Sequence, residues 1–304
     1  FRVEFECEFL GSVDTLISSA KLKSLVYDEP IQSNRGLDIY FEPIKNHDYV
    51  LTVDVARGVG IDYSAFIITD ITSFPHKVIG KYKNNEIKPM LFPSIIVDIA
   101  KAYNNAFILC EVNDIGDQVA SILQYDLENE NVLMCAMRGR AGQVVGQGFS
   151  GTKTQLGVKM STTVKKIGCS NLKQLVETDK VLINDYDIIA ELTTFIQKRQ
   201  SFEADDGCHD DLAMCLVIFG WLVAQDYFKE MTDNDIRSRI YEEQKNQIEQ
   251  DMAPFGFIDD GLGTYEKEKD QEGNVWVVAD NKGWYEGESP RDEYGELSSL
   301  WEYR

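Results

Sequence analysis

The sequence predicts an α/β protein in which helices cover a mixed sheet, followed by an acidic C-terminal appendage. Three strand-like segments, 49–56, 65–71 and 76–84, follow one another with short turns between them, which indicates an antiparallel meander. Strands and helices then alternate along the chain, as they do where helices pack on a sheet. The apolar stretch 212–225 is too short to span a membrane and is typical of a buried helix.

After the meander, each element is predicted from its own pattern. "LFPSIIVDIAKAYN" has apolar residues at helical spacing, whereas "AFILCEV" is a short apolar run typical of a buried strand. The same reasoning predicts, in order, a helix at 91–104, a strand at 106–112, a helix at 116–127, a strand at 131–137, a glycine-rich loop at 139–151, a mostly helical stretch at 153–178, a short strand at 180–185, an amphipathic helix at 186–200 and the apolar helix at 209–226.

Composition divides the chain into three parts. Residues 1–46 are expected to be a lead-in, mostly loop-like after a short helix. Residues 47–228 hold the alternating elements and form the main domain. Residues 229–304 are expected to be a partly ordered tail that begins with a charged helix near 233–250. The segment 227–304 carries 20 acidic and 9 basic residues, a net charge of −11.

Bulk properties exclude some classes of function. The 304-residue chain has a formal net charge of −21, which argues against a stand-alone nucleic-acid-binding protein. It does not exclude an enzyme that approaches DNA through metal ions and a local basic groove. The six cysteines form no C-x-x-C pair, so we expect reduced thiols and neither disulfides nor zinc ligands. The chain starts without Met and inside a strand-like pattern, so we expect a fragment of a longer polypeptide.

Acidic residues interrupt three apolar segments. Asp54 lies inside "VLTVDVA", Glu111 ends "AFILCEV", and Asp210 and Asp211 precede "LAMCLVIFGWL". Each has an ordinary interpretation, since a strand-end acid is commonly a solvated loop residue and an Asp before a helix commonly caps it. Asp54 resists that interpretation because apolar residues surround it, and burying a carboxylate without a partner is costly.

Taken together, the acids predict a metal site. Acids at one strand centre, one strand end and one helix start can converge at a single edge of a sheet, where they repel one another unless cations neutralise them. Hard oxygen ligands suit Mg²⁺ or Mn²⁺. Two such ions can activate a water and stabilise the leaving oxygen in phosphodiester cleavage.

Three motifs in this order resemble one known family. "TVDVARGVGIDYSAFIITD", "ILCEVNDIGDQVASIL" and "GCHDDLAMCLVIFGWL" are similar to the C-terminal nuclease domain of the large terminase subunit of tailed bacteriophages, especially the T-even type. The resemblance covers about residues 1–228. It implies an RNase H-like fold and a metal-dependent endonuclease that cuts concatemeric viral DNA before and after headful packaging. It also implies an N-terminal ATPase motor on the same polypeptide, portal and small terminase partners, and a place in the host cytoplasm and, transiently, at the procapsid portal.

The resemblance also implies roles for individual residues. Asp54 matches the first catalytic acid and Glu111 the second, while the third falls in "HDDLA", with Asp211 favoured over Asp210. Asp62 matches an acid of the first motif that supports the metal site or serves only as a turn residue. A further position, His209, suits a metal-site or DNA-contacting side chain, with an ordinary surface histidine as the alternative.

Double-stranded DNA must be held by local basic groups if the chain is a nuclease. The candidates follow or precede the glycine-rich loop and are Arg138, Arg140, Lys153, Lys165 and Lys166, with ordinary surface charges as the alternative. "GQGFSGTKT" at 146–154 is not a phosphate-binding P-loop, because Thr152 separates the glycine from the lysine that must follow it directly.

Three other functions remain open at this point. A Holliday-junction resolvase uses similar acids and would prefer four-way junctions. An RNase H-fold phosphotransferase, such as a sugar kinase, also begins with a strand, an acid and a glycine-rich turn, but it needs a second phosphate loop. A non-catalytic docking module of a viral motor would use the acids as caps and surface charge.

Overall fold

The computed structural model describes residues 14–58, 60, 62–137, 143–145, 154–230, 232, 267–269, 275–278 and 284–285. The chain divides into two units, Phe1–Glu242 and Glu243–Arg304, which we describe separately. No helix within the described ranges is long and apolar enough to cross a membrane.

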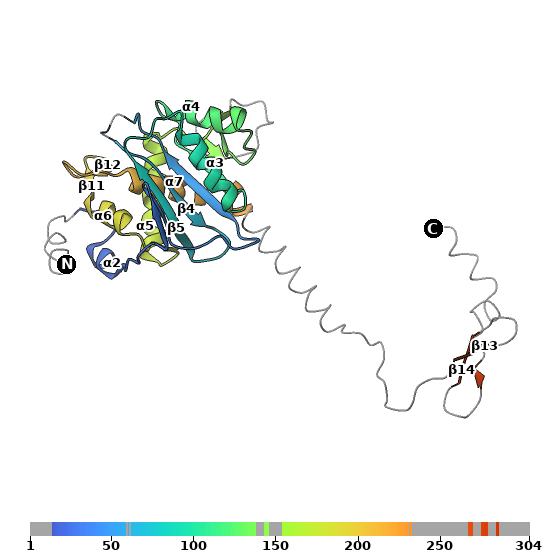
Figure 1. Cartoon of the computed structure of the whole chain (residues 1–304). Helices are drawn as coiled ribbons and strands as arrows, with labels where there is room; N and C mark the ends of the chain where they lie inside the picture. Colours follow the sequence, from blue (N-terminus) through green and yellow to red (C-terminus); the bar gives the residue numbers. More distant parts are fainter. Residues whose placement is uncertain are drawn as a thin grey trace. The chain divides into compact units, whose positions relative to one another are not determined.

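A seven-stranded mixed sheet forms the centre of the first unit (Figure 1). Its strand order is β1-β2-β5-β4-β3-β6, and β10 lies beside β5. The predicted meander is confirmed, because β3, β4 and β5 pair antiparallel, while β6 runs parallel to β3 and β10 parallel to β5. The strands are β1 Gln32–Asn34, β2 Leu37–Ile39, β3 Tyr49–Asp54, β4 Ser64–Asp70, β5 His76–Asn84, β6 Phe107–Cys110 and β10 Val181–Leu182.

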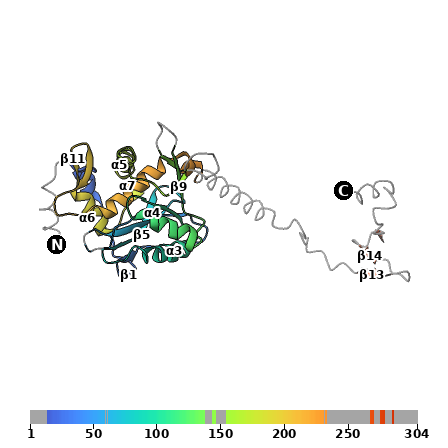
Figure 2. The same ribbon diagram turned by 90° about the horizontal axis from the view of Figure 1, so that it is seen from above.

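Helices cover both faces of this sheet (Figure 2). Alternate residues of a strand point to opposite faces, so Val50 joins one core while Leu51 and Val53 join the other. The first core packs on α5, α6 and α7, and the second on α3 and α4 with the π-helical turn η1. These helices are α3 Phe92–Ala102, α4 Gly116–Ser121, η1 Ile122–Asp126, α5 Thr162–Glu177, α6 Tyr186–Thr194 and α7 Asp211–Val223.

The helix α7 is buried along almost its whole length, which explains why its sequence is apolar all round. It lies against β3 and β4 and also packs on α5. Two glycines allow the close approach of α5 and α7, because a Cβ on Gly168 would lie 2.3 Å from the carbonyl oxygen of Val217. A Cβ on Gly220 would lie 2.6 Å from the carbonyl oxygen of Gly168.

Two predicted helical stretches are wrong in part. The stretch 153–178 was expected to be mostly helical, but β9 (Thr154–Leu156) pairs with β7 (Met134–Met137), which also pairs with β8 (Gln143–Val145). The helix α5 begins only at Thr162, after Ser161, whose hydroxyl accepts a hydrogen bond from the Val164 N–H. Cross-strand pairing between segments distant in sequence therefore overrides the local helical pattern.

The helix predicted for 186–200 ends at Thr194. The next residues form β11 (Phe195–Lys198), which turns at Arg199 and pairs with β12 (Ser201–Ala204). Arg199 has a φ of 58°, a left-handed conformation that ends regular structure. The pairing of β11 with β12 stabilises this hairpin. The sequence of β11 has helical periodicity, so the periodicity alone predicted a helix there.

The described part of the expected lead-in is packed on the domain. Leu16, Ile17 and Leu22 lie in the first core, and the short helix α2 covers Ser19–Ser24. The stretch expected to be loop-like contains the β1–β2 hairpin, and β2 extends the main sheet by pairing with β5.

The second unit contains a small antiparallel sheet. Its strands are β13 Lys267–Lys269, β14 Val275–Val278 and β15 Trp284–Tyr285, with β14 in the middle. The charged helix predicted near 233–250 lies outside the described residues.

Candidate active site

The first two predicted acids stand side by side at the ends of two parallel strands. Asp54 is the last residue of β3, and Glu111 directly follows β6. The register places Val53 opposite Cys110, and the Glu111 N–H donates a hydrogen bond of 2.8 Å to the Val53 carbonyl oxygen. Parallel strands end at the same edge, so this register brings both carboxyl groups to one place.

The helix α7 delivers a third acid to the same edge. Asp211 is its first residue, and its Oδ1 accepts a hydrogen bond of 3.2 Å from the Tyr63 N–H, just before β4. The Thr52 hydroxyl donates a hydrogen bond of 2.9 Å to the Cys215 carbonyl oxygen, which holds α7 against β3. The N-terminus of α7 therefore has a fixed position beside the ends of β3 and β4.

The two neighbouring aspartates have different surroundings. Asp210 occupies the N-cap position, but its side chain makes no capping bond to α7. Its Oδ2 accepts a hydrogen bond of 3.2 Å from the Ala204 N–H instead. Asp211 is 9% exposed, and its Oδ2 is buried with no hydrogen-bond partner. The nearest cationic candidate is the Nδ1 of His209, 3.8 Å away. Simple helix capping does not account for either side chain.

Burial and neighbouring carboxylates raise the pKa values of the three acids. Burial, followed by the charges of Glu111 and Asp211, raises the pKa of Asp54 well above its usual range. Burial raises the pKa of Glu111 to about 7, although the Lys165 charge and a hydrogen bond from Asn113 act in the other direction. Burial also raises the pKa of Asp211. Such a cluster favours a bound cation, which would stabilise the ionised forms.

The donor set fits a hard divalent cation. All three side chains present carboxylate oxygens, and the Oδ2 of Asp211 is left without a partner. Within the described residues, no three His, Cys, Asp or Glu side chains lie close enough together to hold a metal ion by themselves.

Several supporting residues were missed by the sequence reasoning. The Asn113 amide donates a hydrogen bond of 2.7 Å to Glu111 Oε1. Behind Asp211, the Lys83 amine lies 2.5 Å from Glu191 Oε1, while Glu191 Oε2 accepts a bond of 2.9 Å from the Ala213 N–H. Glu191 is 6% exposed. The sequence did indicate Glu191, because this acid lies on the apolar face of the helix predicted at 186–200.

The other predicted site residues differ in whether they contact the acids. Asp62 is exposed and, within the described ranges, makes no hydrogen bond or ion pair. His209 contacts the Tyr63 ring edge-on at 5.0 Å between centroids, beside Asp211. Lys165 is close enough for its charge to lower the pKa of Glu111, and Lys166 is exposed on α5. The three remaining basic candidates, Arg138, Arg140 and Lys153, lie outside the described residues, as does 146–153 of the rejected P-loop.

Comparisons with known proteins identify the family and the fold of this domain. A family model described as the terminase RNaseH-like domain matches residues 51–219. The crystal structure of the large terminase nuclease from thermophilic phage G20c with bound magnesium has a TM-score of 0.52 at 20% identity, covering 69% of this chain and 97% of that chain. The form with bound cobalt has a TM-score of 0.52 at 21% identity, with the same coverage. The predicted RNase H-like fold is confirmed, and the closer likeness to the T-even type stays a prediction.

Proposed function

Because the chain belongs to the terminase RNase H-like domain family, we propose that it is the metal-dependent endonuclease of a viral genome-packaging motor. It cuts concatemeric DNA at the start of packaging and again when the head is full. The observation that carries this proposal is the meeting of Asp54, Glu111 and Asp211 at one sheet edge, with their pKa values raised by burial. Acids gathered in this way favour the binding of cations and phosphodiester chemistry over a purely structural role.

The three acids have a proposed role as metal ligands. The carboxylates of Asp54, Glu111 and Asp211 would hold two divalent cations. When bound, two Mg²⁺ or Mn²⁺ ions supply a water of lowered pKa and stabilise charge on the leaving oxygen. Asn113 orients Glu111 through its amide, and the Tyr63 N–H orients Asp211. The G20c nuclease has been crystallised with bound magnesium and with bound cobalt, which supports a divalent ion here.

The partners are proposed from the family. The substrate is double-stranded DNA, and the motor is an ATPase domain of the same polypeptide. Portal and small terminase proteins bring this domain to the procapsid, so it acts in the host cytoplasm. Because the chain carries a net charge of −21, it would bind DNA weakly without those partners.

Cleavage of supercoiled plasmid tests the proposal. In Mg²⁺ or Mn²⁺ the chain should nick or linearise the plasmid, and Asp54→Asn should abolish this cleavage. The variant should remain folded, as shown by a cooperative melting transition in EDTA. Asp98→Asn is the matched control, since it removes an exposed carboxylate from α3 on the other face of the sheet. Wild-type cleavage by Asp54→Asn would contradict the assignment. A strong preference for four-way junctions over linear duplex would favour a resolvase.

A further inference from the structure

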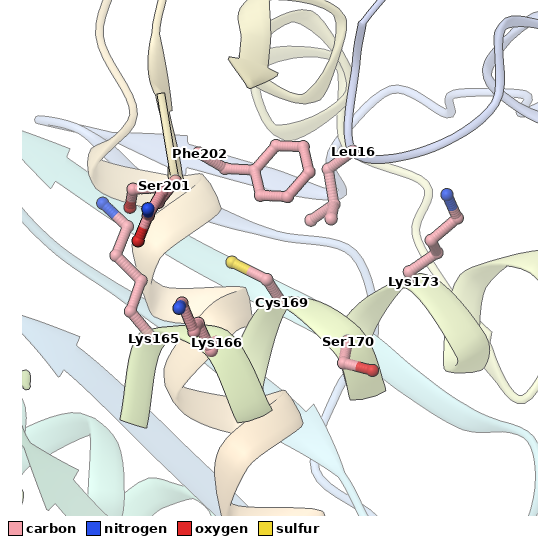
Figure 3. Close-up of a pocket in the computed structure, with 9 residues that line it drawn as sticks. Leu16, Lys165, Lys166, Cys169, Ser170, Lys173, Ser201 and Phe202 are labelled. Carbon is pink, nitrogen blue, oxygen red and sulfur yellow. The ribbon is translucent and has the colours of Figure 1, made fainter. Parts of the chain in front are cut away.

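A cavity of about 180 Å³ lies between α5 and the β11–β12 hairpin, and none of the candidate acids lines it (Figure 3). Its interior is apolar and is formed by Leu16, Cys169 and Phe202. Cys169 and Leu16 are almost fully buried, whereas Phe202 is half-buried and stacks on Phe195 at 6.1 Å between ring centroids. The cavity therefore offers an aromatic ring with an accessible side.

Three lysines of α5 surround this apolar interior. Lys165 and Lys173 are four residues before and after Cys169, so these two lysines lie on the same face of the helix as Cys169. Figure 3 shows Lys165 and Lys166 on one side of the cavity and Lys173 on the other. None of the nine lining residues is acidic. Among the described residues, none of the three lysines forms an ion pair within 4.0 Å. In a chain so acidic overall, this local positive charge favours an anionic ligand.

We propose that this cavity binds unpaired nucleotides of a DNA strand, with a base against Phe202 and the flanking phosphates on Lys166 and Lys173. This inference rests on the proposed nuclease function. An apolar aromatic floor with a cationic rim matches the two halves of a nucleotide, since stacking on aromatic rings and contacts to the backbone hold single strands in general. The volume equals that of about six water molecules, enough for one planar ring and too little for a duplex.

The position of Lys165 connects the cavity to the acids. Its amine lies 5.8 Å from the centroid of the Phe195 ring, beneath the hairpin, and its charge also lowers the pKa of Glu111. A strand held in the cavity would thus continue past Lys165 toward the catalytic edge. The site would favour DNA that is locally opened beside the scissile bond. An acidic peptide would satisfy the lysines but would have no reason to lie next to Glu111.

Fluorescence anisotropy in EDTA tests this inference without cleavage. The probe is a labelled thymidine oligomer of about ten nucleotides. Phe202→Leu should weaken binding of the oligomer about tenfold with an unchanged salt dependence. Phe202→Tyr should bind the oligomer as the wild type does, because the aromatic ring is kept. Lys166→Gln and Lys173→Gln should each reduce the slope of log affinity against log salt by about 0.7. Lys101→Gln, which removes an exposed charge from α3 on the opposite face, should change neither.

The opposite results would overturn the inference. They are wild-type binding of the oligomer by Phe202→Leu, or displacement of the oligomer by polyglutamate as readily as by unlabelled oligomer. Melting temperatures check that each variant is folded. Because binding is measured without divalent ions, a chain that binds the oligomer but never cuts plasmid would contradict only the nuclease proposal. A chain that cuts plasmid but whose oligomer binding ignores Phe202 would contradict only this inference.

Discussion

His76 is a buried imidazole enclosed by phenylalanine rings, and it should make the stability of the domain depend on pH. It is 1% exposed, and neither ring nitrogen has a hydrogen-bond partner in the described part of the chain. The centroids of Phe74, Phe219 and Phe228 lie 4.3, 5.7 and 5.9 Å from that of the imidazole. Burial lowers the pKa of His76 from 6.5 to about 4, only partly opposed by the charge of Asp70 and by the backbone of Ser73.

The sign of the effect follows from these pKa values. The unfolded chain binds the proton of His76 below about pH 6.5, whereas the folded protein does so only near pH 4. The free energy of unfolding is therefore unaffected by protonation of His76 above about pH 6.5, and it falls as the pH is lowered toward 4. Going from about pH 7.5 to about pH 5 should lower the free energy of unfolding by about 2 kcal/mol through this group alone.

Urea unfolding at the two pH values measures this contribution. His76→Phe and His76→Leu should each reduce the loss of stability between the two pH values by about 2 kcal/mol relative to the wild type. Any misfit of the new side chain changes stability equally at both pH values, so it cancels from the difference. At about pH 7.5 we expect little loss or a gain, because a buried polar group without a partner is removed. If both variants keep the wild-type pH dependence, the imidazole is not held neutral by burial.

Three further predictions concern packing and charge. Gly220→Ala should lower the free energy of unfolding by about 1–3 kcal/mol, because the new Cβ would lie 2.6 Å from the carbonyl oxygen of Gly168. An unchanged midpoint of urea unfolding would contradict this close contact. Lys83→Met should lower the free energy of unfolding by about 3 kcal/mol, because it leaves the buried Glu191 carboxylate without its cationic partner. Replacing Glu191 with Leu in the same chain should recover part of that loss in the same assay. Mg²⁺ should raise the melting temperature of the wild type but not of Asp54→Asn, and equal shifts would argue against binding at the acids.

Much of the fold could be predicted because its signals are local. The three strands of the meander show as alternating or continuous apolar runs, and α7 shows as an apolar stretch with helical length. The acids were found for the same reason, since Asp54 and Glu111 each interrupt an apolar segment. The sequence showed only that they could converge at one edge of a sheet, and the parallel register of β3 and β6 is what brings Asp54 and Glu111 together.

Other features depend on pairing between distant segments. The sequence 195–204 has no local reason to leave the helix of α6, and β9 has none to be a strand, until β12 and β7 supply partners. The packing of Leu16 and Ile17 into the first core has the same origin.

By itself, the sequence determined the fold class, the central strands and the identity of the candidate acids, because apolar periodicity and isolated charges are visible one segment at a time. Only the tertiary structure decided which groups surround those acids. Glu191 pairs with Lys83, and Lys165, which lines the cavity beside α5, also lowers the pKa of Glu111. These contacts join elements far apart in the chain. Desolvation and charge pairing arise from such neighbours, so pKa values and binding surfaces are properties of the folded molecule.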